Sequence, residues 1–444
     1  MVYTSLNHPQ RVELAAEVHS RPFLRLEAPE TLTHFAVYVQ TDASFHAAVQ
    51  HDLLIDLCDR FGVTAPDINA KHFFHDFGRF RLKWECHTEF STYTFAQRHE
   101  TALSTEEAFA AVPLTQIPQD WLQTLQGKII MAAHVVLERA SAGQSGESIQ
   151  SMQRVFEGKR LVSSKVVQGG EIWTDFLIQS DGFSRFVVRD IGLRDMQGGQ
   201  LVQRILDIET YRMMALLGLP YAQRAAPLLS AIENDLVMLT ATVVDADHGV
   251  GNPLLAQAED ELNLSKITSL ATRIEKTSLE NSYRFSASQA YFRLVKARIE
   301  ELRESRMEEG VPTIGEFMER RLTPAMDTCI SVARRQETLA DRIAHTNDLL
   351  RTRVGIVQEQ QNRQILESMN TRAEQQLRLQ QAVEGLSVAA ISYYMVGLFG
   401  YAGKALKAVG LPVDPDILTG IMLPVIAVGV WLGLRRMHKS VHHS

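Results

Sequence analysis

The chain has 444 residues, a formal net charge of −7 at pH 7 and a pI of about 6.1. Because this length exceeds one ordinary hydrophobic core, we expect two or three structural units. The charge balance gives no overall basis for nucleic-acid binding. The three cysteines, Cys58, Cys86 and Cys329, have no close spacing. They predict neither a disulfide framework nor a zinc knuckle, and they fit a reducing compartment. The first residues contain no apolar run, so no signal peptide is expected.

Residues 1–195 predict a mixed α+β cytoplasmic domain. Apolar residues at helical spacing cover Ala43–Phe61, and Gly62 ends that helix. Gly169-Gly170 and Asp181-Gly182 have the composition of hairpin turns. Alternating, β-rich runs predict strands at Leu32–Val39, His72–Phe77, Arg79–His87, Glu89–Phe95, Lys128–Glu138, Arg160–Val167, Glu171–Gln179 and Phe183–Arg189.

Residues 196–384 predict a helical bundle followed by a long stalk helix. Apolar spacing predicts helices at Leu201–Leu217 and Pro227–Thr242, and another from Pro253 onward. Thr313 and Glu316 have the spacing of a capping box, which begins a further helix.

The stalk helix is predicted from the region of Thr323 to Glu384, about 60 residues or roughly 90 Å if straight. Its apolar seam is narrow and is interrupted by Thr346 and Gln361. The seam therefore requires partners, either the preceding helices or sister subunits of a homo-oligomer.

Residues 385–434 predict two transmembrane helices, at 385–403 and 417–434, joined by a short loop. Neither run contains Asp, Glu, Lys, Arg or His. At 1.5 Å per residue the two runs reach roughly 27–28 Å, close to the hydrocarbon thickness of a bilayer. The lipid bilayer is therefore the expected partner of this region.

The charges beside these runs predict the orientation. Residues 435–444 form a basic tail that contains Arg435, Arg436 and Lys439. By the positive-inside rule this tail is cytoplasmic, and two spans then place the N-terminus in the cytoplasm as well. Lys404 and Lys407 in the connecting loop weaken the asymmetry. Both termini are thus expected at the cytoplasmic face of the membrane.

Glycines recur within both apolar runs, as Gly397, Gly400 and Gly403 in the first and Gly429 and Gly433 in the second. Small residues at this spacing allow helix backbones to approach closely in lipid. Glycine is also simply common in membrane helices, and the two readings stand side by side.

Four stretches resemble a family of predicted membrane-anchored bacterial proteins, a domain of unknown function. They are His8-Pro9 with Glu17–Pro22, Asp76–Glu85, His87–Phe90 and Glu384–Tyr394. The resemblance spans essentially the whole chain. It implies an inner-membrane protein and brings no established activity.

The architecture is also similar, more distantly, to the CorA magnesium-transporter superfamily, whose members form pentamers with the first span lining the pore. Their Gly-Met-Asn signature is replaced here by Gly397–Gly403, and no Asn follows Asn370. The departure falls on the residues that would select the ion. If the chain is a channel, this resemblance implies Ser392, Tyr393, Gly397 and Gly400 as pore-lining residues.

The family resemblance also brings forward a set of candidate ligand-binding residues in the first domain. Glu85, His87 and Glu89 alternate and are expected to share one face of a strand. This face either holds a phosphate or carboxylate through nearby arginines or is simply solvated. The candidate ligand-binding set is Glu17, His19, Arg21, Arg79, Arg81, Glu85 and His87.

No catalytic motif, cofactor fingerprint or metal-ligand pattern is found in the sequence. His72 and His75 are three residues apart in a strand and point to opposite faces. The acid-rich stretch Glu300–Glu309 either binds divalent cations in an oligomer or is a solvated helix face. The sequence thus predicts a non-enzymatic binding, sensing or scaffold protein, anchored in the membrane and oligomeric, with a cytoplasmic ligand or protein partner of unknown identity. A divergent CorA-like divalent-cation channel or transporter is the alternative, and a membrane-tethered enzyme using the Glu17 and Glu85 regions is a third reading.

Overall fold

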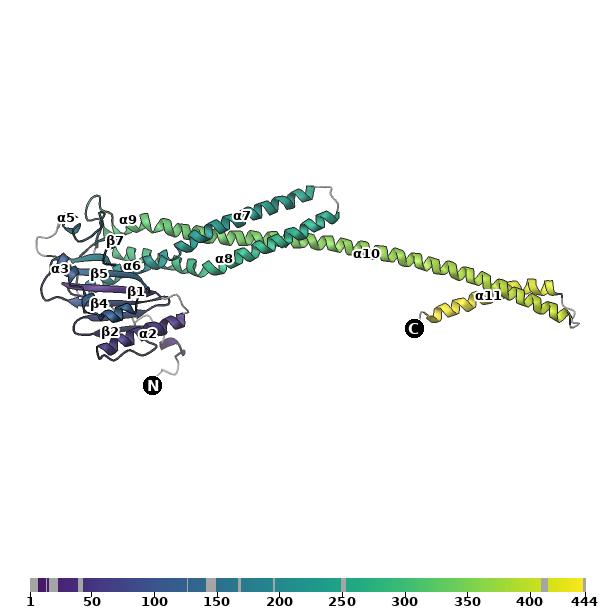
Figure 1. The fold of residues 1–444 in the computed structure, drawn as a ribbon, viewed down its shortest axis with the longest axis horizontal. Helices are drawn as coiled ribbons and strands as arrows, with labels where there is room; N and C mark the ends of the chain where they lie inside the picture. Colours follow the sequence, from purple (N-terminus) through teal and green to yellow (C-terminus); the bar gives the residue numbers. More distant parts are fainter. Residues whose placement is uncertain are drawn as a thin grey trace. The chain divides into compact units, whose positions relative to one another are not determined.

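A nine-stranded sheet and a set of long helices make up the fold in the computed structural model (Figure 1). The structure describes residues 7–12, 14–15, 23–38, 43–125, 127–140, 149–166, 169–194, 196–248, 253–408 and 414–441. The chain divides into two compact units, the first formed by Met1–Val244 with Lys266–Thr346 and the second by Asp245–Ser265 with Asn347–Ser444. The predicted mixed α+β class, with a large sheet and a long helix, is confirmed.

The sheet has the strand order β2-β3-β4-β1-β5-β8-β7-β6-β9. Among the described pairs β5 and β8 are parallel and the others antiparallel. Each strand predicted from the sequence overlaps an observed one. The strands are β1 (Glu30–Tyr38), β2 (His72–Asp76), β3 (Arg81–Cys86), β4 (Phe90–Arg98), β5 (Ile129–Arg139), β6 (Val162–Val166), β7 (Gly170–Ile178), β8 (Ser184–Asp190) and the two-residue β9 (Glu304–Ser305).

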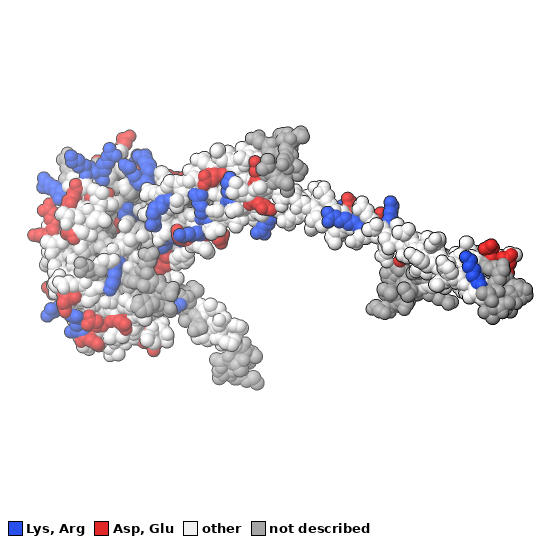
Figure 2. All heavy atoms as spheres, turned by 45° about the vertical axis from the view of Figure 1, so that its right-hand side comes forward, with Lys and Arg blue, Asp and Glu red and all other residues white. Residues whose placement is uncertain are grey.

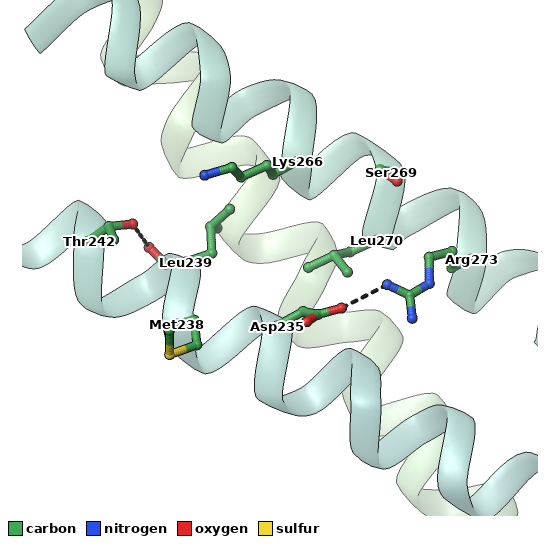
Figure 3. A pocket seen from close by; sticks show the side chains of 8 residues that line it. All are labelled: Asp235, Met238, Leu239, Thr242, Lys266, Ser269, Leu270 and Arg273. Carbon is green, nitrogen blue, oxygen red and sulfur yellow. Dashed lines mark hydrogen bonds and ion pairs between the residues drawn. The ribbon is translucent and has the colours of Figure 1, made fainter. Parts of the chain in front are cut away.

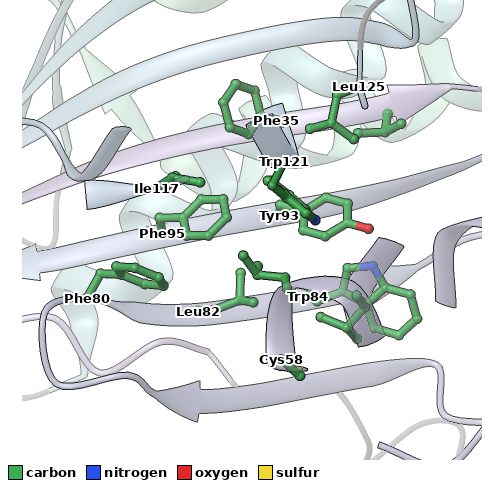
Figure 4. Close-up of a cluster of buried hydrophobic side chains, with 13 residues drawn as sticks. Phe35, Cys58, Phe80, Leu82, Trp84, Tyr93, Phe95, Ile117, Trp121 and Leu125 are labelled. Atoms are coloured by element: carbon green, nitrogen blue, oxygen red, sulfur yellow. The ribbon is translucent and has the colours of Figure 1, made fainter. Parts of the chain in front are cut away.

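Alternation along β1, β3 and β4 separates two faces of the sheet, and both are buried. On the first face lies an apolar core covered by α2 (Ala43–Arg60) and α4 (Gln119–Gln123), shown in Figure 4. Trp121 of α4 is fully buried there, and its indole N–H donates to the carbonyl of Leu53 at 2.9 Å. A buried tryptophan removes on the order of 200 Å² from water, about 5 kcal/mol of transfer free energy. This side chain therefore anchors α4 and α2 to each other.

Smaller elements complete the first unit. Ser104 and Glu107 form a capping box on α3 (Thr105–Ala110). The others are η2 (Pro113–Gln116), α5 (Ile149–Met152) and α9 (Ile314–Arg321). The predicted capping box of Thr313 and Glu316 begins α9, with the Glu316 amide donating to the Thr313 hydroxyl at 3.2 Å.

The long helices are α6 (Gln197–Leu216), α7 (Leu219–His248), α8 (Pro253–Leu302), α10 (Thr323–Ala408) and α11 (Pro415–Val441). Within the first unit α7, α8 and α10 pack pairwise. Arg273 of α8 pairs with Asp235 of α7 at 2.7 Å, and Arg335 of α10 pairs with Glu233 of α7 at 2.5 Å. Buried residues on α7 recur by threes and fours at 222, 225, 229, 232, 236 and 239. This spacing keeps one face of the helix in contact with its neighbours.

The prediction that a helix begins at Pro227 is wrong, because α7 begins at Leu219 and Pro227 lies inside it. Proline costs an interior hydrogen bond. Ala222 and Ala225 are nevertheless buried in the turns before it. Packing of these turns outweighs the local penalty, which sequence propensity alone does not show.

The stalk prediction is confirmed in its main feature, since α10 is one continuous helix from Thr323 to Ala408 and contributes to both units. In the second unit Arg353 donates to Asp260 at 3.0 Å, and Gln361 donates to Gln257 at 2.5 Å. Beyond these contacts, residues 362–383 of α10 are all exposed.

One helix among the described residues is long and apolar enough to cross a membrane, by length and composition. Its apolar stretch lies in α10, and none of that stretch is buried. The apolar part of α11, Thr419–Gly433, is shorter. Figure 2 shows an uncharged stretch near the end of α10, between two groups of charged side chains. Length and composition thus support one candidate membrane span, in α10. They do not establish the predicted two-helix hairpin.

Two glycines provide a matched test of the packing. An added Cβ at Gly199 of α6 would lie 1.8 Å from the carbonyl oxygen of Leu24, whereas at Gly355 of α10 it would meet nothing within 4 Å. We expect Gly199→Ala to lower the free energy of unfolding by about 1–3 kcal/mol. Gly355→Ala should raise it by about 0.5–1 kcal/mol through helix propensity. Denaturant unfolding of the detergent-solubilised protein measures the free energy of unfolding of both variants. Equal changes would show that the Leu24 carbonyl does not lie against Gly199.

Candidate functional site

The second face of the sheet carries charged side chains that are buried under α6 and α8. Lys83 and Glu85 alternate on β3 with Leu82 and Trp84, so they point away from the apolar core. The Lys83 ammonium lies 3.0 Å from a Glu85 carboxylate oxygen, and both side chains are buried. The same ammonium donates to the Gln203 side chain of α6 at 2.9 Å. Sheet and helix are thus joined through buried charge.

This network continues from α6 to α8. Gln203 donates to Asp207 at 2.7 Å, and Arg298 of α8 donates to the other oxygen of Asp207 at 3.1 Å. Burial raises the pKa of Asp207, and the nearby Glu85 carboxylate adds to the effect, while Gln203 and Arg298 oppose it. The two donors therefore offset part of the effect of burial on this carboxyl group.

A second ion pair lies where β4 begins. Arg284 of α8 donates to both oxygens of Glu89, at 2.7 and 3.3 Å, and both side chains are buried. The Arg284 Nε has no hydrogen-bond partner among the described atoms. Burial, together with the Glu89 charge, raises the pKa of Tyr291. The Tyr291 ring lies 6.1 Å from Phe90, so an aromatic wall borders the pair.

We call this set the polar layer; its members are Lys83, Glu85, Glu89, Gln203, Asp207, Arg284 and Arg298. Its three carboxylates are matched by three cations, so the layer is neutral as a whole. Burying a charge without a partner costs several kcal/mol, whereas a matched set avoids that cost. The layer thus holds α6 and α8 on the sheet and fixes their register.

His34 of β1 lies in the same buried face. Its Nδ1 is 2.8 Å from the Thr94 hydroxyl, and its Nε2 is 3.4 Å from the Thr210 hydroxyl of α6. Burial lowers the pKa of His34 to about 3, and the charges of Lys83 and His87 add to this. The imidazole is therefore neutral at physiological pH.

The structure describes four of the seven residues predicted to bind a ligand, Arg79, Arg81, Glu85 and His87. Glu17, His19 and Arg21 lie outside the described residues. Arg79 is exposed in the turn between β2 and β3. Arg81 pairs with Glu30 and also donates to the carbonyl of Arg25 at 2.6 Å.

Glu85 joins the polar layer, whereas His87 stacks on Phe90 with ring centroids 4.5 Å apart. The prediction that Glu85, His87 and Glu89 share one face of a strand is wrong. The His87 amide donates to the Phe90 carbonyl at 2.8 Å, which closes a tight turn after β3 ends at Cys86.

Sequence reasoning missed His34, Asp207, Arg284 and Arg298. A signal was present on α8, where buried polar residues occur at 277, 281, 284 and 288, at the spacing of the seam that packs inward. A polar residue at such a position requires a buried partner. The sequence does not say which strand supplies that partner.

A groove lies between α7 and α8, with a volume of about 470 Å³ (Figure 3). Met238, Leu239 and Leu270 give it an apolar surface. Lys266 lies on its wall, and the exposed Asp235–Arg273 ion pair crosses it at 2.7 Å. Such a groove is suited to an amphipathic ligand or peptide.

A second hollow, of about 580 Å³, lies between the end of α10 and the start of α11. Of the predicted pore-lining residues, Tyr393, Gly397 and Gly400 line it. Ser392 is half-buried, and its hydroxyl has no hydrogen-bond partner among the described atoms. Within the described residues no group of three or more His, Cys, Asp or Glu side chains is placed to hold a metal ion.

The comparisons with known proteins identify a family whose function is unknown. The model described as "Protein of unknown function (DUF3422)" matches residues 6–441. No curated protein matches the chain. A solved structure, "structure of the full-length CmaX protein", aligns at 13% identity and a TM-score of 0.16, covering 69% of this chain and 89% of that one. A TM-score this low carries no argument about fold or function. The CorA-like prediction has no support from these comparisons.

The buried Glu89–Arg284 pair and the exposed Asp235–Arg273 pair form a matched comparison. Arg284→Gln leaves a buried carboxylate without its cation, and we expect the free energy of unfolding to fall by about 3–5 kcal/mol. Arg273→Gln should cost less than about 1 kcal/mol, because its pair is solvated. Adding Glu89→Gln to Arg284→Gln should restore part of the loss. A double-mutant cycle measured by denaturant unfolding gives these free energies. Equal losses of unfolding free energy for Arg284→Gln and Arg273→Gln would show that the Glu89–Arg284 pair is not buried.

The neutral His34 makes stability depend on pH. The unfolded imidazole binds a proton near pH 6.5, whereas the folded one does so near pH 3. Between these values the unfolded state binds more protons, so stability falls by about 1.4 kcal/mol for each unit that the pH drops.

We expect His34→Gln to flatten this dependence between pH 6.5 and 3. His134→Gln should flatten it over a narrower range, since burial lowers the pKa of His134 only to about 4. Unfolding midpoints measured across this range test both variants. An unchanged slope for His34→Gln would show that the imidazole is not buried in its neutral form.

Proposed function

The chain belongs to the family described as protein of unknown function (DUF3422), and we propose that it is a non-enzymatic, membrane-anchored protein of the bacterial inner membrane. In this proposal α10 and α11 form a transmembrane hairpin, and the α+β head binds a ligand or protein partner at the cytoplasmic face. Homo-oligomers form through the stalk and the hairpin.

The observation that carries the proposal is the unburied apolar stretch of α10. A core helix of a soluble protein buries its apolar side chains, but Leu398 is 63% exposed and Tyr393 is 77% exposed. Contiguous apolar surface of this kind marks a membrane or protein interface. A length of 19 uncharged residues at 385–403 favours the membrane.

Residues of α11 support the second span and the orientation. Ile421, Leu423, Val425 and Val428 are exposed apolar residues in the uncharged run 417–434. The basic residues that follow this run favour a cytoplasmic tail. A hairpin would then place both termini on the same side.

The stalk supports the oligomer. The exposed residues Ile365, Met369, Leu379, Val383 and Leu386 of α10 fall at spacings of three, four and ten. These spacings place them on one helical face. A lone helix with an uncovered apolar face is marginal in water, and the same face on a second copy would cover it.

The head offers a place for a partner in the groove between α7 and α8. Lys266 adds one cation to the Asp235–Arg273 pair in its lining, while Met238 and Leu270 are apolar. The polar layer makes the sheet, α6 and α8 one rigid support for this groove. An acidic amphipathic segment is the ligand chemistry that fits best.

The alternative is a divergent CorA-like cation channel. It requires Ser392, Tyr393, Gly397 and Gly400 to face a continuous pore. The hollow that contains three of these residues has one cation, Lys404, and one carboxylate, Asp416, so its charge does not select cations. This observation favours the scaffold over the channel.

Membrane anchoring is tested with a charged double variant. Each arginine at the centre of a span costs about 2.5–3.5 kcal/mol of insertion free energy. We expect the native chain in the carbonate-washed membrane pellet and Val396→Arg with Leu398→Arg largely released from it. Gln375→Arg with Gln380→Arg, in the stalk, adds the same charge and should stay in the pellet. Recovery of the native chain in the supernatant would exclude the proposal.

The oligomer is tested by native mass spectrometry of the detergent-solubilised protein. We expect a discrete oligomer that Ile365→Glu with Val383→Glu dissociates, because charges on the shared face repel in a parallel assembly. Asn370→Glu with Gln381→Glu, on the opposite face of α10, serves as the charge-matched control and should leave the mass unchanged. A pentamer that conducts cations in liposomes would favour the channel. A native monomer would exclude both the oligomeric scaffold and the channel.

A further inference from the structure

The hollow between α10 and α11 has its charges at one end. Lys404 lies near the end of α10, and Asp416 lies in the first turn of α11. The Lys404 ammonium is 5.9 Å from the centre of the Tyr401 ring. No ion pair joins Lys404 or Asp416 to another residue in the described part of the chain. A cation and a carboxylate thus face one hollow without neutralising each other.

The rest of the hollow is open and lies along glycines. A Cβ added at Gly397 would meet nothing within 4 Å, and at Gly400 the nearest atom would be the Thr419 hydroxyl at 3.6 Å. Gly397 therefore leaves space rather than allowing another helix to approach. Tyr393 and Tyr401 line the same space and are 77% and 73% exposed.

The length of the hollow matches one leaflet of a bilayer. From Lys404 back to Tyr393 the helix rises roughly 16 Å, about half of the 30 Å hydrocarbon core. Lys404 directly follows the uncharged run 385–403, which places it at the level of the headgroups if that run spans the membrane. A lipid can then lay an acyl chain along the glycines with its headgroup at the charged end.

We propose that this hollow binds an aminophospholipid, with Lys404 holding the phosphate and Asp416 accepting hydrogen bonds from the primary ammonium group. The inference rests on the proposed function, because it requires α10 and α11 to lie in the bilayer. A phosphatidylglycerol offers no cation to Asp416. A phosphatidylcholine carries a quaternary ammonium group that has no N–H to donate. The carboxylate therefore selects for the amine, and the lysine holds any phospholipid.

The test is lipid retention by the full-length protein in native mass spectrometry. The detergent-solubilised protein is mixed with equal amounts of phosphatidylethanolamine, phosphatidylglycerol and phosphatidylcholine. We expect phosphatidylethanolamine to be retained about tenfold more than either other lipid, the effect of one charge-assisted hydrogen-bonding group. Asp416→Asn should remove this preference, and Lys404→Gln should lower retention of all three lipids. Arg378→Gln, on the exposed part of α10, removes a cation elsewhere and should change neither.

The outcomes separate the lipid site from the membrane anchor. Equal retention of the three lipids by a protein found in the washed membrane pellet would overturn the site and leave the anchor intact. A preference that survives Asp416→Asn would also overturn it. Competition by soluble glycerophosphoethanolamine as effectively as by the lipid would show a headgroup site that needs no acyl chain, against the proposal. A hollow filled by a second copy would give oligomers without bound lipid, which would likewise overturn it.

Discussion

The polar layer on the second face of the sheet is the interaction on which the first unit depends. Strands β1, β3 and β4 are buried on both faces, so every side chain on them needs a partner inside the protein. The first face satisfies this with apolar packing around Trp121. The second face satisfies it with Lys83, Glu85 and their partners on α6 and α8. Because these charges are matched only when both helices are in place, sheet and helices cannot shift independently.

The polar layer also links the head to the helices that lead toward the apolar segment. Glu89, at the start of β4, is paired with Arg284 of α8, and α8 is joined to α10 through Asn281 and Gln336, whose amides lie 3.5 Å apart. A contact chain therefore runs from the sheet to α10 within the first unit. Helix α10 continues without a break from Thr323 to Ala408 and contributes to both units. The binding or sensing role that we propose for the head would act on α10 through these contacts.

The apolar segment obeys a different constraint from the head. Inside the head, exposed apolar area is removed by protein packing, and the buried residues alternate or recur by threes and fours. In the last part of α10 the apolar residues surround the helix and none of the apolar stretch is buried. In the membrane arrangement that we propose, the hydrocarbon core of the bilayer covers this surface. In that arrangement Lys404 and Asp416 lie at the level of the polar headgroups, which is why a lipid is the partner inferred for them.

The sequence by itself determined the strands, the long helix and the apolar runs, because these depend on periods of two, of 3.6 and on uninterrupted hydrophobicity. Such signals are local, and each can be read within a window of some twenty residues. It also identified Glu85 as chemically notable, though as part of a face that binds a ligand or is solvated. The segment from Gln97 to Gln126, with its capping box at Ser104 and buried Trp121, yielded no prediction because its helices are too short to show a period. Only the tertiary structure decided that Lys83 meets Gln203, 120 residues away, and that Glu89 meets Arg284 across 195 residues. Those pairings depend on which helix covers which face of the sheet, and no local pattern encodes that choice.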